Sequence, residues 1–114
     1  MAISKIYSQD KKVCRVTFTL PKEVCENFEE ISVVGDFNDW DPHHDKFSHR
    51  LSDGSSSIEL VLDAGNEFKF RYLCDGATWL NEPEADAEVL THYGDSKNSV
   101  IVVWVNNVRG YASY

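Results

Sequence analysis

Apolar and polar residues alternate in several short segments of this chain, and each segment ends at a turn signal. In residues 13–20, Cys, Val, Phe and Leu occupy every second position, and Pro21 ends the pattern. Residues 58–63 and 68–74 alternate in the same way, and Asp75-Gly76 ends the second of these segments. A period of two residues is typical of a β-strand that buries one of its faces. The pattern therefore predicts a protein built from β-sheets.

Further segments complete the predicted sheets, and no segment carries a sustained helical period. The further strands are an apolar run at 31–35, a brief edge strand at 48–51 and a last strand at 99–105. Residues 23–30 have room for one helical turn at most. Many short strands separated by turns predict an all-β sandwich.

The length of 114 residues suits one domain with a single hydrophobic core. We assign the sandwich to residues 13–105, with an N-terminal segment at 1–12 and a C-terminal tail at 106–114. The chain begins with Met and runs little past the last strand, so we expect a free-standing module.

The net charge limits the classes of binding partner, and the cysteine content indicates the cellular compartment. The formal net charge is −8, which disfavours nucleic acid and anionic membranes because both require a basic surface. The polar segment 1–12 lacks the apolar stretch of a signal peptide, and no apolar run is long enough to span a membrane. The three cysteines are odd in number and have no CxxC spacing, which favours thiols packed in the core of a cytoplasmic protein.

Two tryptophans follow turn signals. Trp40 closes the stretch Gly35-Asp36-Phe37-Asn38-Asp39-Trp40, and Trp79 follows the turn at Asp75-Gly76. A large flat ring beside a turn is costly to expose unless a ligand stacks on it. Residues 80–98 are acidic and long for a loop, and such loops are often functional. We therefore expect the two indoles to form a platform for a flat, uncharged ligand, with residues 80–98 as a wall beside Trp79.

Three sequence blocks resemble the family-48 carbohydrate-binding modules. The blocks are Val-Val-Gly-Asp-Phe-Asn-Asp-Trp-Asp-Pro (33–42), Phe-Lys-Phe-Arg-Tyr-Leu-Cys-Asp-Gly-Ala-Thr-Trp (68–79) and Gly-Asp-Ser-Lys-Asn-Ser-Val (94–100). The family includes the early-set domain of isoamylases and glycogen-branching enzymes and the glycogen-binding domain of the AMP-activated protein kinase beta subunit. The resemblance covers nearly the whole chain and implies an immunoglobulin-like (early-set) β-sandwich of about seven to eight antiparallel strands. It also implies an α-1,4-linked glucan as the ligand.

The resemblance implies six carbohydrate-binding residues, namely Trp40, Arg71, Trp79, Tyr93, Ser96 and Asn98. The two tryptophans match positions that stack on glucose, Arg71 matches a basic residue that contacts hydroxyls, and Tyr93 matches a residue that packs against the sugar chain. Ser96 and Asn98 match a hydroxyl residue and an Asn. The chain departs from kinase-type members by Arg instead of Lys at 71, by one extra residue before Trp79 and by a longer loop before Ser96.

The chemistry of these residue types agrees with a sugar ligand. An indole can cover the C–H face of a pyranose ring, and Arg and Asn can donate hydrogen bonds to the hydroxyls around its edge. Arg71 alternates with Phe70 and Tyr72, so it points outward if those two side chains face the core. With few contacts and a flexible ligand, we expect an affinity on the order of micromolar to millimolar.

Structural explanations compete with the functional ones. Trp40 or Trp79 could cap the core, and Arg71 could be a solvated strand residue. We assign Trp104 a structural role on the last strand, and Asp36 and Asn38 the role of holding their turn.

Other polar clusters are weaker candidates for chemistry. The residues that could bind a metal ion are His43, His44, Asp45 and His49. They lie in a predicted loop, where no strand pairing fixes the positions of the ligands, so a metal site is a weak candidate. A glycosidase needs two carboxylates that face each other across a cleft. The acids Glu82, Glu84, Asp86 and Glu88 are expected instead to form a solvated face. The sequence therefore predicts neither a catalytic site nor a metal or cofactor site.

The sequence as a whole predicts a stand-alone, non-catalytic module that binds glycogen, starch or maltooligosaccharide. Association with a glucan-metabolising enzyme, such as a glycoside hydrolase or a branching or debranching enzyme, is an expectation from the resemblance. The alternative is a protein-interaction domain of the same fold that has lost sugar binding.

Overall fold

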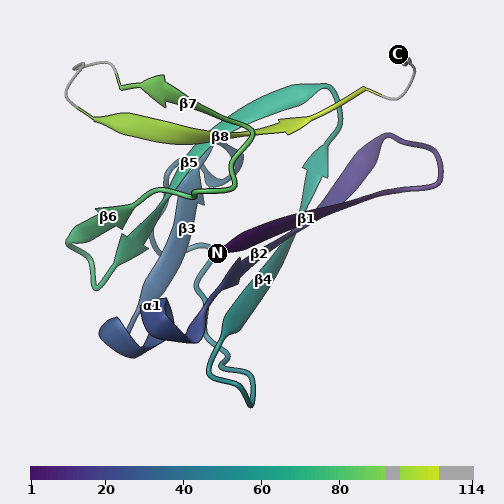
Figure 1. Ribbon diagram of the computed structural model, residues 1–114. Coiled ribbons are helices and arrows are strands. Elements are labelled where there is room, and N and C mark those ends of the chain that lie inside the picture. The colour runs from purple at the N-terminus through teal and green to yellow at the C-terminus, as the bar shows by residue number, and fades with distance from the viewer. Residues whose placement is uncertain (92–95, 106–114) are drawn as a thin grey trace.

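A computed structural model describes residues 1–91 and 96–105 of the chain (Figure 1). Strands make up most of it, with one short α-helix and one 3₁₀ turn. The elements in chain order are β1 (Ala2–Tyr7), β2 (Val13–Leu20), α1 (Lys22–Asn27), β3 (Ile31–Gly35), η1 (Asp36–Asn38), β4 (Ser56–Asp63), β5 (Asn66–Cys74), β6 (Thr78–Leu80), β7 (Ala87–Leu90) and β8 (Lys97–Val103).

The strand order confirms the predicted all-β sandwich. One sheet has the order β1-β2-β4, and the other has the order β3-β5-β8-β7 with β6 paired to β5 beside that path. All of these pairings are antiparallel, and Figure 1 shows the sheets as two layers. The first sheet takes the places of strands A, B and E of an immunoglobulin-like sandwich, and β3, β5 and β8 take those of C, F and G.

The core lies between the sheets and consists of the alternating residues. Val16 and Phe18 of β2 and Phe70 and Tyr72 of β5 are all fully buried in it. The rings of Phe18 and Phe70 pack edge-on with their centroids 5.3 Å apart. The three cysteines are free thiols buried in the same core, as the sequence predicted. Because the even-numbered residues of β5 face inward, Arg71 faces outward.

Strand β1 was not predicted, and Lys5 explains why. Ile3 and Tyr7 pair with core-facing residues of β2, as expected for an amphipathic strand. Lys5 holds the inward position between them, opposite Val16, so the apolar alternation is interrupted in the sequence. The Lys5 ammonium reaches past the core to the other sheet, where it binds the Asp86 carboxylate at 2.7 Å.

Side chains satisfy one edge of β8 where none of the described strands pairs with it. The Val102 N–H donates to Asp86 Oδ2 at 2.7 Å, and Lys5 Nζ donates to the Val102 carbonyl at 2.9 Å. The Trp104 N–H then donates to Tyr7 Oη at 2.9 Å. The bonds from Lys5 and to Tyr7 join the N-terminal strand to the end of β8 across the two sheets.

The predicted edge strand at 48–51 is wrong. The chain pairs with β3 just before this segment, up to Phe47, whose side chain is buried. The segment before it runs along β3, with the Val33 N–H donating to Asp45 O and the Phe47 N–H donating to Ile31 O. After Phe47 the chain makes only an isolated bridge, between Arg50 and Ser56.

Several other element boundaries also differ from prediction. β4 begins at Ser56, β8 runs from Lys97 to Val103, and the region of residues 80–98 contains a strand, β7, that was not predicted. The helix α1 spans six residues, more than the single turn expected. In residues 1–91 and 96–105, no helix has the length and apolar character needed to cross a membrane.

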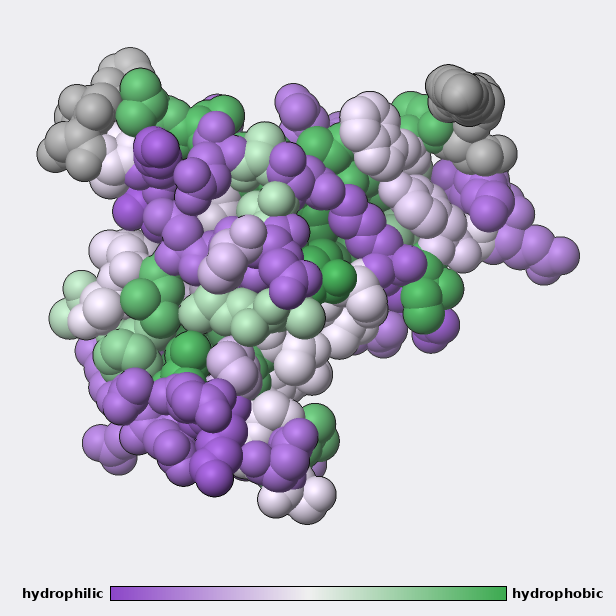
Figure 2. Space-filling model, in the orientation of Figure 1, coloured by the Kyte–Doolittle hydropathy of each residue, from purple (hydrophilic) through white to green (hydrophobic). Residues whose placement is uncertain are grey.

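Most of the face seen in Figure 2 is hydrophilic, with hydrophobic residues in small separate groups. Such a distribution is normal for a domain of this size. The candidate site must therefore be found from specific side chains and their contacts.

Candidate functional site

The outward face of the second sheet brings together four of the six predicted site residues. The pairing of Phe70 with Ser99 places Asn98 of β8 beside Arg71 of β5. Arg71 Nε donates to Asn98 Oδ1 at 2.7 Å, and Arg71 Nη2 donates to Ser96 Oγ at 3.4 Å. The Arg71 guanidinium carbon lies 5.6 Å from the ring centroid of Trp79, within the range of a cation–π contact. Residues distant in the sequence thus form one cluster around the guanidinium.

A tight hairpin presents Trp79 on this face. Strand β6 pairs with the end of β5, and Trp79 lies opposite Leu73, which faces outward like Arg71. The turn between the strands uses positive φ angles at Asp75 (52°) and Gly76 (71°). Asp75 Oδ1 also accepts hydrogen bonds from the N–H groups of residues 29 and 30, at 3.0 and 2.9 Å. The hairpin is therefore anchored, and its indole is 45% exposed.

Trp40 lies in a loop that covers the outward face of β3. Ser32 and Val34 alternate with core-facing residues and so point away from the core, yet both are buried, Val34 completely. Ser32 Oγ donates to the carbonyl of Pro42 at 2.7 Å, which places the loop over this face. Val34 is also the register partner of Arg71. Trp40 is partly exposed and lies two residues before Pro42, at the start of the segment that covers this face.

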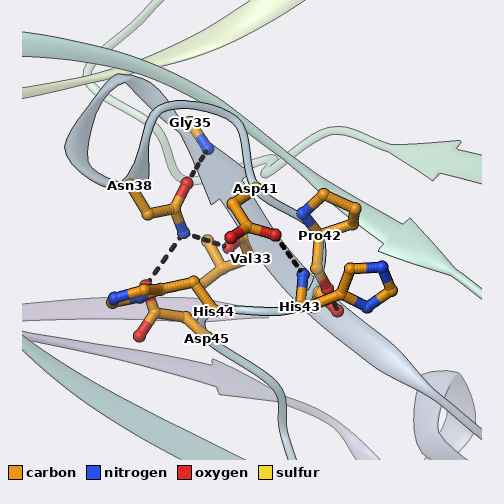
Figure 3. A network of polar contacts seen from close by, with 9 residues as sticks. Val33, Gly35, Asn38, Asp41, Pro42, His43, His44 and Asp45 are labelled. Carbon is orange, nitrogen blue, oxygen red and sulfur yellow. Dashed lines mark hydrogen bonds and ion pairs between the residues drawn. The ribbon is translucent and has the colours of Figure 1, made fainter.

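Asn38 holds the turn that carries Trp40 (Figure 3). Its Oδ1 accepts the Gly35 N–H at 3.0 Å, and its Nδ2 donates to Val33 O at 2.9 Å and to Asp45 Oδ2 at 2.8 Å. The Asn38 side chain is buried, so these bonds are protected from water. A Cβ at Gly35 would collide with the Lys69 carbonyl, which explains the glycine at the start of the turn.

Asp36 fixes the indole of Trp40 directly. Its Oδ1 accepts the Trp40 Nε1–H at 2.9 Å, and its Oδ2 accepts the Lys69 N–H at 2.8 Å. The prediction that Asp36 and Asn38 hold the turn is confirmed. The ring of Trp40 is thereby restrained by its polar edge, and its orientation does not depend on burial alone.

Beside this turn, His44 Nδ1 lies 2.9 Å from Asp45 Oδ2 (Figure 3). The hydrogen bond and the charge of Asp45 raise the pKa of His44 above its ordinary value of 6.5. A raised folded-state pKa stabilises the fold below about pH 6.5, and this contribution is lost as pH rises through the folded-state pKa.

We therefore expect His44→Gln to lower the melting temperature slightly at about pH 5.5 and to leave it unchanged at about pH 8.5. Thermal unfolding of both proteins at the two pH values measures this difference. An equal difference at both pH values would contradict an ionic role for His44.

A buried polar network lies directly behind the Arg71–Trp79–Asn98 cluster. Tyr72 Oη donates to Glu82 Oε1 at 2.5 Å, and the Glu84 N–H donates to Glu82 Oε2 at 3.0 Å. Ser99 Oγ accepts the Glu82 N–H at 2.9 Å and donates to Asn81 Oδ1 at 2.8 Å. Burial and the neighbouring carboxylate raise the pKa of Tyr72, so the phenol remains a proton donor.

The network connects to the cluster through adjacent residues of the chain. Tyr72 follows Arg71, Ser99 follows Asn98, and Asn81 comes two residues after Trp79. Glu82 is 1% exposed, so the expectation of a solvated position is wrong for this acid, while Glu84, Asp86 and Glu88 are exposed as expected. The burial of Glu82 could not be recognised from the sequence, because closely spaced acidic residues are typical of a solvated loop. Only the fold shows that one of these acids lies in the protein interior.

Two further expectations about the site need comment. Tyr93 lies outside the described residues. Trp104 is 67% exposed, so the structural role expected for it on the last strand is wrong. The strand ends at Val103, and the indole lies beyond the pairing that would have buried it.

The cluster is suited to holding a neutral polar ligand. A guanidinium has five N–H donors, and the Arg71 guanidinium uses two of them in its bonds to Asn98 and Ser96. These two bonds fix the orientation of the planar group, and the remaining donors can bind a ligand. The exposed indole beside it adds a flat apolar surface. Among residues 1–91 and 96–105, no three His, Cys, Asp or Glu side chains are grouped as a metal site requires.

Neither protein-family models nor curated protein sequences match this chain. The resemblance to family-48 carbohydrate-binding modules therefore stays a prediction. What the site can do has to be argued from its own geometry.

Proposed function

We propose that the outward face of the second sheet binds α-1,4-linked glucan without catalysing a reaction. The observation that carries the proposal is the contact of one guanidinium with an exposed indole, a carboxamide and a hydroxyl, in Arg71, Trp79, Asn98 and Ser96. These groups come from three strands and their connections, so the fold holds them together. Trp40, at the start of the loop over β3, is the second aromatic ring that we assign to this surface.

The chemistry of a pyranose ring fits such a surface. One face of the ring presents C–H groups that stack on an indole, and the hydroxyls around its edge accept and donate hydrogen bonds. A neutral ligand experiences no long-range repulsion from a protein with a net charge of −8. The free, buried cysteines support a cytoplasmic location, where glycogen-like polymers would be the available ligands.

The second candidate function is a protein-interaction domain of the same fold. The observation in its favour is strand β7, whose residues are all exposed and include Val89 and Leu90 at the edge of the sheet. An exposed edge strand can pair with a strand of another chain. A glucan-metabolising enzyme is the partner we propose for such a surface.

Titration with maltoheptaose, followed by intrinsic tryptophan fluorescence, tests the first proposal. We expect a saturable change that is insensitive to added salt, because the ligand carries no charge. Arg71→Leu should weaken binding about tenfold, or about 1.4 kcal/mol, because it removes charged donors to the hydroxyls.

Arg71→Lys is the matched control, since it keeps the charge and loses the planar fork. It should weaken binding less than Arg71→Leu does. A flat titration of the wild-type protein at millimolar maltoheptaose would reject glucan binding, and capture of a glucan-metabolising enzyme would then favour the second candidate.

A further inference from the structure

Trp104 is exposed although the backbone around it is fixed. Its N–H donates to Tyr7 Oη at 2.9 Å, and the carbonyl of Val103 accepts the Gly65 N–H at 2.7 Å. Val103 itself is completely buried. The indole, 67% exposed, is therefore presented from an anchored position and not from a loose end. An exposed tryptophan in such a position is costly without a ligand.

A shallow groove of about 380 Å³ lies beside this indole. Its lining includes Val102 and Glu67. Among the described lining residues there is no basic side chain, which disfavours an anionic ligand. A flat aromatic ring beside a carboxylate acceptor suits the C–H face and the hydroxyl donors of a sugar.

The groove opens on the same face of the sheet as the Arg71 cluster. Glu67 alternates with Lys69 and Arg71 along β5, so all three point outward, and Val102 is the register partner of Glu67. Trp79 lies at the level of Leu73, and Trp104 follows Val103, which pairs with Asn66. The two indoles are therefore separated by roughly 25 Å along β5, from a rise of about 3.3 Å per residue.

We propose that Trp104 and Glu67 form a second subsite for the same α-glucan polymer. This inference rests on the proposed function, because the ligand class is taken from it. We infer a polymer as the ligand because Trp79 and Trp104 lie on the same face of one sheet. One long or branched glucan chain can therefore contact both indoles. Binding at both places raises the apparent affinity through the effective concentration of the second contact.

The experiment compares a short ligand, maltotriose, with a long branched one, glycogen. Trp104→Ala should bind maltotriose at the Trp79 subsite with unchanged affinity and bind glycogen about tenfold more weakly. Trp104→Phe retains a flat ring and should bind glycogen nearly as well as the wild-type protein. Melting temperatures of both variants check that the fold is intact.

A variant with Trp104 as its single tryptophan, Trp40→Phe with Trp79→Phe, provides an independent signal. Saturable change of its fluorescence on adding maltoheptaose supports the second subsite even if the Arg71 cluster does not bind sugar. Unchanged fluorescence, or equal glycogen affinity of wild type and Trp104→Ala, overturns the inference and leaves the proposed function standing. Absence of any glycogen binding by the wild-type protein overturns both.

Discussion

Replacing Trp79 with alanine is expected to weaken the binding of maltoheptaose about thirtyfold, which corresponds to about 2 kcal/mol. The substitution removes the most exposed ring of the Arg71 cluster, together with the aromatic partner of the guanidinium at 5.6 Å. Without the indole, Arg71 loses a contact that restrains its fork, so both stacking and hydrogen bonding to the sugar are reduced. Isothermal titration calorimetry measures the change.

Trp79→Phe is the control for this experiment. A phenyl ring retains a smaller flat surface, so the affinity should fall between those of wild type and Trp79→Ala. Because the indole is nearly half exposed and lies outside the core, neither substitution should change the free energy of unfolding by more than about 1 kcal/mol. Equal affinities of wild type and Trp79→Ala would show that the ring does not contact the sugar.

The second large effect is expected at Glu82, where alanine should lower the free energy of unfolding by about 3 kcal/mol. The substitution leaves the phenol of Tyr72 and the N–H of Glu84 without their acceptor in a buried setting. An unsatisfied buried polar group costs more than the hydrogen bond contributed. A domain of this size is stable by about 5–15 kcal/mol, so urea unfolding should detect the loss readily.

Glu84→Ala provides the matched control, because this exposed acid lies two residues further along the chain. Its effect should stay within about 0.5 kcal/mol. A double-mutant cycle with Tyr72→Phe should show that the two substitutions are not additive. If Glu82→Ala unfolds at the wild-type urea concentration, the buried network does not stabilise the fold.

The fold was predictable wherever alternation was unbroken. β2 and β3 begin and end at the predicted residues, because Pro21 ends one and Gly35 the other. β1 escaped prediction because Lys5 occupies an inward position whose partner, Asp86, lies 81 residues away in the sequence. The 48–51 prediction failed because the pairing of this segment with β3 ends at Phe47, which is buried.

The site was predictable in its residue types but not in its supporting structure. Turn signals and strand parity indicated Trp40, Arg71 and Trp79, and the fold places Ser96 and Asn98 with Arg71. The inward position of Glu82 depends on Tyr72 and Ser99, which come from strands that meet only in the folded sheet. The exposure of Trp104 depends on where β8 stops pairing, and a single sequence does not determine that point.

The side chains that satisfy the free edge of β8 also bear on self-association. The unpaired N–H and carbonyl groups of Val102 and Trp104 would otherwise be a template on which a foreign strand could add. Asp86 accepts the Val102 N–H, while Lys5 and Tyr7, on a strand outside the predicted domain boundary of 13–105, bind the Val102 carbonyl and the Trp104 N–H. A shortened domain cut at Val13 would lose the Lys5 and Tyr7 contacts and keep the Asp86 contact, and we expect it to self-associate more readily through this edge.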